Sequence, residues 1–290
     1  MSHGSHLVAG RLEAAAGSCG EGPQSVEEPD QLALLHLRIA LRAPACPVCQ
    51  LAREAATRYL QYLLREHVNH LDARIRISES QGFCPQHAWE LFYLEVALCY
   101  GPLGNSIIYE DLVGQIARAL QNADGGPGRA AEPGFWQRCW SVLRRRSIGE
   151  PQRRPGLALT PRRECRACES HRQASEFFAV NLVRMLADPE YQAMYVASDG
   201  ICLPHLRLAL QLADSEAGRL HLIASTRARL VVLRANLGEF KRKQAWQYRH
   251  ESPTEEEQTA TRRAVAVFAG PDVTDDSRQP AKSETHPPAG

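Results

Sequence analysis

The sequence has 290 residues, 44% of which are hydrophobic, and its formal net charge is +1. A chain of this length and composition can bury one or two ordinary cores, but no stretch approaches the ~18 uninterrupted apolar residues of a membrane span. The near-neutral charge does not favour a protein that binds nucleic acid over its whole surface. We therefore expect a folded protein that makes no use of a membrane.

The chain divides at glycine- and proline-rich stretches. Residues 1–29 are rich in Gly, Ser, Ala and Glu and lack an apolar segment after a basic start, which predicts a disordered tail and no signal peptide. Residues 122–163 are a predicted Gly/Pro/Arg-rich linker, and residues 271–290 are a second disordered tail. Two predicted helical units remain, residues 30–121 and residues 164–270.

Each unit begins with an amphipathic helix. After Cys49, apolar residues recur in steps of four, and the second unit shows a similar stripe. Gly82 and Gly200 then predict a tight turn before the next helix of each unit. The two apolar stripes are Leu51, Ala55, Tyr59 and Leu63 in the first unit, and Ala174, Phe177, Phe178, Leu182 and Leu186 in the second.

Further helices follow in both units. Residues 108–120 have an apolar face, and Asn105 and Ser106 are candidate caps. The longest predicted helix runs from about residue 214 towards residue 248 and contains three heptads. We expect its heptad positions to pack on the chain's own bundle, with a homodimer through residues 215–248 as the alternative. These positions are Ile223, Leu230 and Leu237, and Thr226, Leu233 and Phe240.

A last helix is predicted near the C-terminus. Ser252, Pro253 and Glu255 supply an N-cap, a first-turn proline and a capping acid, and the helix should end near Gly270. No alternating run of β-branched residues indicates a strand. We predict an all-α fold in which two pseudo-repeated zinc-knuckle helical units pack into one bundle.

A doubled cysteine and histidine motif is the most specific feature of the sequence. In each unit a Cys-x-x-Cys is followed by a Cys-x-x-His, and the segments between them, 50–83 and 169–201, are 34 and 33 residues long. Such agreement in ligand type and spacing indicates an internal repeat. The first set is Cys46, Cys49, Cys84 and His87, and the second is Cys165, Cys168, Cys202 and His205.

Three thiolates and one imidazole are a standard ligand set for structural zinc. We expect each set to close one site within its own unit, which gives two Zn²⁺ ions per chain. Each ion would contribute on the order of 10 kcal/mol of folding free energy and fix helix ends about 35 residues apart. An iron–sulfur cluster with one histidine ligand is the alternative.

Other side chains near the motifs are less favoured as ligand candidates because of their positions. His67, His70 and His171 lie close in sequence, but none has a counterpart in the other unit. The acids Glu54, Glu66, Glu90 and Glu95 fall on amphipathic helices, where we expect them to be solvated rather than to act as general acids. We therefore keep His87 and His205 as the histidine ligands.

Four segments of the chain resemble a known bacterial family. They are Cys46-Pro-Val-Cys49, Gly82-Phe-Cys84-Pro-Gln-His87, Gly200-Ile-Cys202-Leu-Pro-His205 and the stretch from Gly238 to Glu251. On these motifs residues 32–270 are similar to the family known as domain of unknown function 6062. The resemblance implies two cysteine-histidine knuckles in a helical domain and implies no activity.

Four protein ligands fill a tetrahedral zinc site, whereas catalytic zinc keeps a position open for water. No phosphate-binding glycine loop, G-x-S-x-G or H-E-x-x-H occurs. We therefore expect a non-enzymatic interaction or adaptor module that binds another protein. The cysteine usage without a signal peptide predicts a cytoplasmic location.

Two other functions remain open. Between Arg138 and Arg163 there are eight arginines and one acid, with Trp136 and Trp140 beside them, and a second basic-aromatic cluster runs from Lys241 to Arg249. Such segments can neutralise phosphates and stack on bases, so the chain could bind nucleic acid. The Cys-x-x-Cys pairs could alternatively serve a thiol redox protein, although no βαβ pattern surrounds them.

Overall fold

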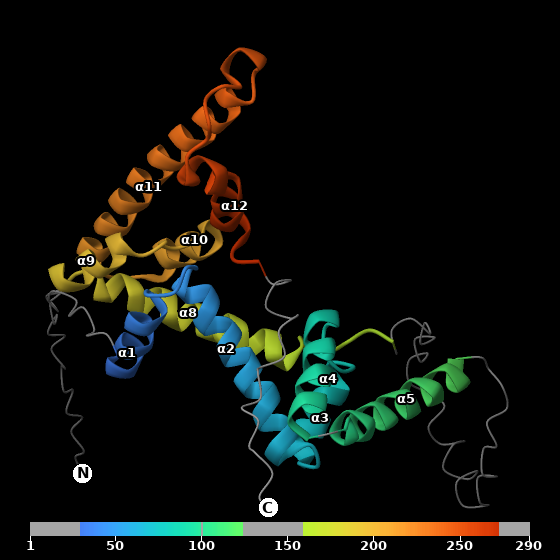
Figure 1. The fold of residues 1–290 in the computed structure, drawn as a ribbon. Helices are drawn as coiled ribbons and strands as arrows, with labels where there is room; N and C mark the ends of the chain where they lie inside the picture. The colour runs from blue at the N-terminus through green and yellow to red at the C-terminus, as the bar shows by residue number, and fades with distance from the viewer. Residues whose placement is uncertain (1–29, 100, 124–158, 273–290) are drawn as a thin grey trace, which may run out of the picture.

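A computed structural model describes residues 30–99, 101–123 and 159–272, and every regular element in them is helical (Figure 1). This confirms the all-α prediction. No helix among these residues is long and apolar enough to cross a membrane. The elements are α1 (Gln31–Ala40), α2 (Pro47–Tyr62), a π-helical turn (Leu63–His67), α3 (Leu71–Glu79), α4 (Pro85–Cys99), α5 (Leu103–Ala123), α8 (Arg166–Met185), α9 (Pro189–Ala197), α10 (Leu203–Leu212), α11 (Glu216–Lys243), a 3-10 turn (Trp246–Tyr248) and α12 (Glu255–Ala269). The predicted tail 1–29, most of the linker and nearly all of the tail 271–290 lie outside the described residues.

Helices α2 and α8 form the centre of the fold and run antiparallel. The start of α2, at Val48 and Leu51, packs with the end of α8, while Ala56 and Leu60 further along α2 pack with Ala167 at the start of α8. The other helices attach to the two ends of this pair (Figure 1). The antiparallel direction decides which helices meet at each end.

Two hydrophobic cores follow from this arrangement. The first joins α1 and the start of α2 to the end of α8 and to α9, α10 and α11, around the fully buried Leu37, Leu182 and Tyr195. The second joins the end of α2 and α3, α4 and α5 to the start of α8, around Leu60 and Leu91. Each core therefore takes residues from both sides of the linker.

The predicted glycine turns are confirmed. Gly82 has φ +95° and Gly200 has φ +78°, a region of backbone conformation that favours glycine, and each precedes a Cys-x-x-His. Gly218 has a different role, because its Cα lies so close to the carbonyl of Val183 that any Cβ would overlap the oxygen. It allows α11 to cross α8 at close range.

Several helix starts differ from the predictions. Helix α5 begins at Leu103, so Asn105 and Ser106 lie in its first turn rather than capping it. Helix α12 has Thr254 as its N-cap, and the capping box is completed by Glu257 instead of Glu255. Shifts of this size are common at helix ends, because several polar residues near a helix start can cap it.

The buried carboxylate of Glu95 corrects another expectation. Its side chain is not solvated: the residue is 3% exposed and accepts hydrogen bonds from the backbone N–H groups of Gly104 and Asn105. The Asn105 side-chain amide donates a further bond of 2.6 Å to it. Glu95 thus anchors the start of α5, where unpaired N–H groups and the helix dipole favour a negative charge.

Candidate metal centres

All eight predicted ligands lie at the starts of helices. Cys46, Cys165 and Cys202 are the residues that cap α2, α8 and α10, and Cys84 directly precedes α4. The second ligand of each pair comes three residues later, on the same side of the first turn. Prolines in the first turn of three of these helices fit such starts. The ligands of each Cys-x-x-Cys and each Cys-x-x-His therefore point from the N-terminal end of one helix.

The eight side chains gather in two groups of four. We call Cys46, Cys49, Cys202 and His205 site A, and Cys84, His87, Cys165 and Cys168 site B. Within each site the ligand atoms all lie within 4.8 Å of one another. His67, His70 and His171 belong to neither group, so the choice of His87 and His205 agrees with the structure.

The predicted pairing of the ligands is wrong. Each site takes its Cys-x-x-Cys from one unit and its Cys-x-x-His from the other, so neither unit closes a site by itself. The reason is the antiparallel packing of α2 on α8, which brings the start of α2 beside α10 and the start of α8 beside α4. The two candidate metal centres lie at the starts of the two antiparallel helices, and each links residues from both sides of the linker.

The distances suit a tetrahedral metal ion. In site A the His205 Nδ1 lies 3.1, 3.2 and 3.7 Å from the sulfurs of Cys49, Cys202 and Cys46, and the Cys49 and Cys202 sulfurs are 3.5 Å apart. In site B the corresponding nitrogen-to-sulfur distances are 3.2, 3.3 and 3.8 Å, with one sulfur pair at 3.5 Å. Zinc bonds of about 2.3 Å to sulfur and about 2.05 Å to nitrogen give tetrahedral edges of about 3.8 and about 3.6 Å.

The thiols of site A have opposite pKa shifts. Burial would raise the pKa of Cys46, yet hydrogen bonds with Cys202, Cys49 and His205 lower it well below its ordinary value. The pKa of Cys49 is raised by its contacts with the other two sulfurs and by burial. One thiolate is thus favoured, and its neighbour keeps a proton because adjacent thiolates repel each other.

Site B shows the same opposition. The pKa of Cys165 is lowered, since its hydrogen bond to His87 and backbone N–H groups outweigh its burial. The pKa of Cys168 is raised by burial and by the neighbouring Cys84 sulfur. A divalent cation in either site would replace the shared protons and offset the repulsion among the sulfurs. The donor set and its electrostatics therefore fit a bound metal ion.

A buried serine supports the histidine of site A. The Ser175 hydroxyl lies 3.2 Å from the His205 Nε2 and donates a 2.9 Å hydrogen bond to the carbonyl of His171. With its own proton committed to that carbonyl, the hydroxyl oxygen accepts from the Nε2–H, which leaves Nδ1 free to bind the metal. Sequence reasoning missed Ser175, although a serine on the apolar side of the predicted helix was a signal.

We expect Ser175→Ala to weaken zinc binding in site A by about tenfold, because the His205 ring loses the hydrogen bond that holds it in the orientation for metal binding. Competition with a chromophoric chelator would measure the affinity of each site. Ser225→Ala is the matched control, since Ser225 also donates to the carbonyl four residues back, at 2.8 Å, and contacts no ligand. An unchanged affinity in Ser175→Ala would contradict the role assigned to the hydroxyl.

The end of α12 covers part of site A. Gly270 ends this helix with φ +86°, and a Cβ at this position would lie 3.3 Å from the Cys49 sulfur. The predicted end of the last helix near Gly270 is thereby confirmed. A glycine here allows the backbone to approach the thiolate closely, so the C-terminal helix contributes to the closure of the site.

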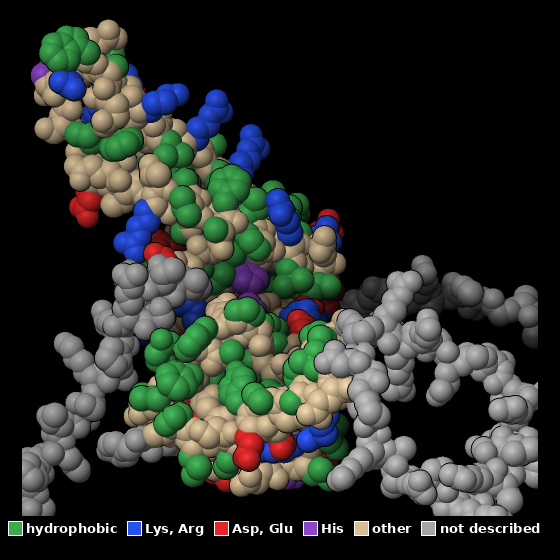
Figure 2. Space-filling view, turned by 90° about the vertical axis from the view of Figure 1, so that its right-hand side faces the viewer, with side chains coloured by type: hydrophobic (Ala, Val, Ile, Leu, Met, Phe, Trp, Pro, Cys, Tyr) green, Lys and Arg blue, Asp and Glu red, His purple; other side chains and the backbone are tan. Residues whose placement is uncertain are grey.

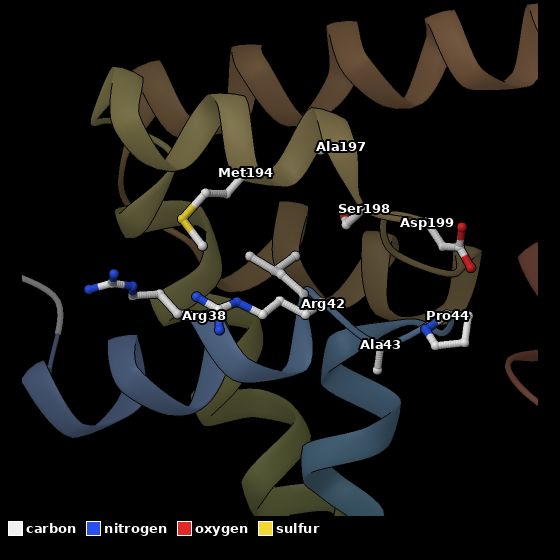
Figure 3. A pocket seen from close by; sticks show the side chains of 9 residues that line it. Arg38, Arg42, Ala43, Pro44, Met194, Ala197, Ser198 and Asp199 are labelled. Carbon is white, nitrogen blue, oxygen red and sulfur yellow. The ribbon is translucent and has the colours of Figure 1, made fainter.

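A separate hollow lies between the end of α1 and α9. Its volume is about 690 Å³, and its polar lining is Arg38, Arg42, Ser198 and Asp199. Arg38 and Arg42 lie at the C-terminal end of α1, where positive charge stabilises the helix dipole, and Asp199 points away from them (Figure 3). This lining has no paired nucleophile and base, so the hollow does not have the composition of a catalytic site.

Comparison with known proteins agrees with the motifs. No curated protein and no solved structure matches the chain. A family model described as a family of unknown function, DUF6062, matches residues 39–271, which include both metal centres and α12. The chain therefore belongs to this family of unknown function, DUF6062.

Proposed function

We propose that this protein is a non-enzymatic interaction module whose helices are held in place by two structural zinc ions, one in each site. The observation that carries the proposal is that each site offers four protein ligands at tetrahedral spacing. A zinc ion bound by all four has no open position for water or substrate, which is the arrangement of structural sites. The role of the metal is then to join α2 and α8 to the helices at their ends.

Zinc is favoured over iron by the ligand set. Three thiolates and one imidazole close a mononuclear tetrahedral site, whereas iron–sulfur clusters commonly use four cysteines. The six cysteines of the two sites are free thiols, and they must stay reduced to bind metal. The proposal thus places the protein in a reducing compartment such as the cytoplasm.

Two of the four cations in the second basic cluster, Arg242 and Lys243, are paired with acids of the protein and add no support to the nucleic-acid alternative. The guanidinium of Arg242 forms ion pairs with Glu239 and Glu251, and the ammonium of Lys243 pairs with Glu257. These cations are neutralised within the protein and are poorly placed to bind phosphates. The arginine-rich segment from residue 138 to residue 158 lies outside the described residues, so that part of the alternative stays a prediction.

Elemental analysis with thiol labelling tests the proposal. We expect two zinc ions and no iron per chain, and slow alkylation of the six ligand cysteines until a chelator is added. The thiol redox alternative predicts the reverse, with rapid labelling and disulfide exchange in the metal-containing protein. Iron in the purified protein, or ready alkylation with zinc still bound, would overturn the structural role.

A further inference from the structure

The outer side of α11 is apolar and has no partner among the described residues. Leu222 and Leu233 are buried against the protein, whereas Leu220, Ile223, Leu230 and Val231 are 61, 46, 40 and 62% exposed. The expectation that the heptad positions pack on the bundle is therefore correct for Leu233 and wrong for Ile223 and Leu230. Exposed apolar side chains that follow one helix face are typical of a binding surface.

A column of cations runs along the same side of α11. Arg227, Arg234 and Lys241 are exposed, lie seven residues apart and form no ion pair with a described residue. At 1.5 Å per residue they are about 10 Å apart along the helix. Residues 217–238 contain no acid. In the space-filling view, Lys and Arg side chains line one edge of the projecting part of the molecule, which α11 and α12 form, beside hydrophobic side chains (Figure 2). We call these three cations and the four exposed apolar residues the α11 face.

Apolar side chains lie on both sides of the cation column, and Leu220, seven residues before Arg227, continues the column itself. By helical spacing, Ile223 and Leu230 are on one side of the Arg227 column and Val231 is on the other. A membrane-binding helix has the opposite order, with apolar residues in the centre and cations at the edges. Insertion of this face into a lipid surface would carry its arginines into the acyl region.

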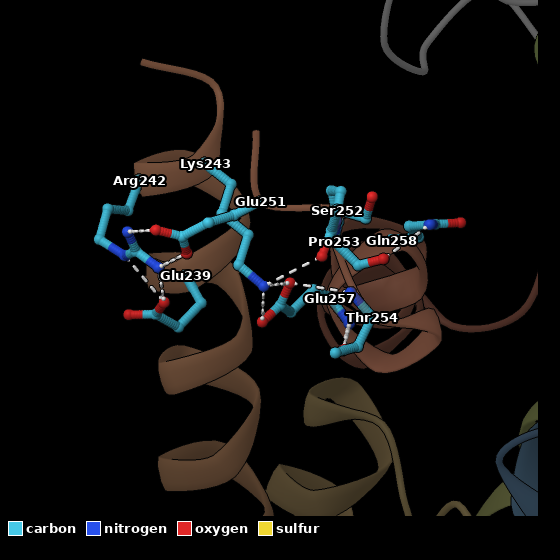
Figure 4. Close-up of polar contacts among 9 residues, drawn as sticks. All are labelled: Glu239, Arg242, Lys243, Glu251, Ser252, Pro253, Thr254, Glu257 and Gln258. Carbon is cyan, nitrogen blue, oxygen red and sulfur yellow. Dashed lines mark hydrogen bonds and ion pairs between the residues drawn. The ribbon is translucent and has the colours of Figure 1, made fainter. Parts of the chain in front are cut away.

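The far end of α11 is fixed, so the face is preorganised (Figure 4). Arg242 donates to both carboxylate oxygens of Glu251, at 3.2 and 2.5 Å. Lys243 donates to both oxygens of Glu257, at 3.0 and 2.8 Å, and Glu257 also caps the start of α12. These contacts join the end of α11 to α12. A rigid surface loses little entropy when it binds a partner.

The charges of the α11 face favour one kind of binding partner over the others. In a twofold dimer the same patch meets itself, so the cation column would lie against a second cation column. That repulsion argues against the homodimer through residues 215–248. A phosphate backbone would satisfy the cations but leave Leu220 and Val231 against a polar ligand. A protein partner with carboxylates flanked by apolar residues satisfies both kinds of side chain.

We propose that the α11 face binds an amphipathic helix of another protein, with one Asp or Glu per heptad and apolar residues on both sides of that acidic column. The seven-residue spacing of Arg227, Arg234 and Lys241 matches the heptad period of such a helix. Ion pairs would set the partner's register, and the flanking apolar contacts would contribute the buried area. This inference rests on the proposed interaction function and names the class of partner.

The test uses the zinc-loaded full chain and two synthetic helical peptides. One peptide carries Glu once per heptad between two Leu columns, and the other has Lys in place of Glu. We expect fluorescence anisotropy to show at least ~10-fold tighter binding of the Glu peptide. The triple variant R227E/R234E/K241E should reverse the preference, whereas a control with equal charge change elsewhere, R42E/R65E/R118E, should keep it.

Equal binding of both peptides, or no reversal in the triple variant, would overturn the inference. So would tighter binding to a single-stranded RNA oligonucleotide, to phosphatidylserine vesicles or to a second copy of the chain in light scattering. Zinc content is measured in the same samples. A chain with two zinc ions that fails to distinguish the peptides overturns this inference alone, whereas a chain without them overturns the proposed function.

Discussion

A variant carrying Cys49→Ser and Cys202→Ser is expected to retain one zinc ion per chain, whereas Cys49→Ser with Cys84→Ser should retain none. In the structure Cys49 and Cys202 both belong to site A, so the first double variant leaves site B complete. Cys84 belongs to site B, so the second double variant damages both sites. If each unit closed its own site, the results would be exchanged: the first double variant would retain no zinc ion and the second would retain one.

The measurement is the zinc-to-protein ratio after dialysis against a weak chelator that removes metal from sites with three ligands. Two further double variants repeat the test with other cysteines. Cys84→Ser with Cys168→Ser should retain one ion, and Cys168→Ser with Cys202→Ser should retain none. Each single variant should retain one ion under either pairing and serves as the control. One ion in the Cys49→Ser and Cys84→Ser protein would show that the crossed arrangement is wrong.

The sequence carried enough information to identify the candidate ligands but not to pair them. Residue type and matched spacing select the same eight side chains that the structure brings together. The intervals of 34 and 33 residues fit closure within a unit as well as exchange between units. The choice depends on the antiparallel packing of α2 on α8, which results from contacts between distant segments and leaves no local signal.

Buried polar residues were missed for a related reason. Glu95 and Ser175 occur in helices whose amphipathic pattern was predicted, and acids or serines in such helices are usually solvated. Their burial depends on partners that lie elsewhere, namely the start of α5 for Glu95 and His205 for Ser175. Similarly, the heptad positions of α11 predicted an apolar stripe but could not show which of its residues would be covered.

Removal of both zinc ions is expected to unfold the two cores together. Each structural zinc contributes on the order of 10 kcal/mol, whereas the net stability of a folded protein is about 5–15 kcal/mol. In the crossed arrangement the ions also join distant segments, because Cys49 and Cys202 are 153 residues apart and Cys84 and Cys168 are 84 residues apart. Without metal, the chain entropy of closing these long loops opposes folding.

Circular dichroism during heating would measure this effect in the zinc-loaded protein, after chelation and after zinc is restored. We expect chelation to abolish the cooperative transition and zinc to restore it. The one-zinc variant Cys49→Ser/Cys202→Ser should unfold less cooperatively than the zinc-loaded protein and more cooperatively than the chelated one. A chelated protein that still unfolds cooperatively near the original temperature would show that the apolar cores suffice. Because both ions bridge both halves of the chain, we expect loss of either one to weaken both cores rather than one unit alone.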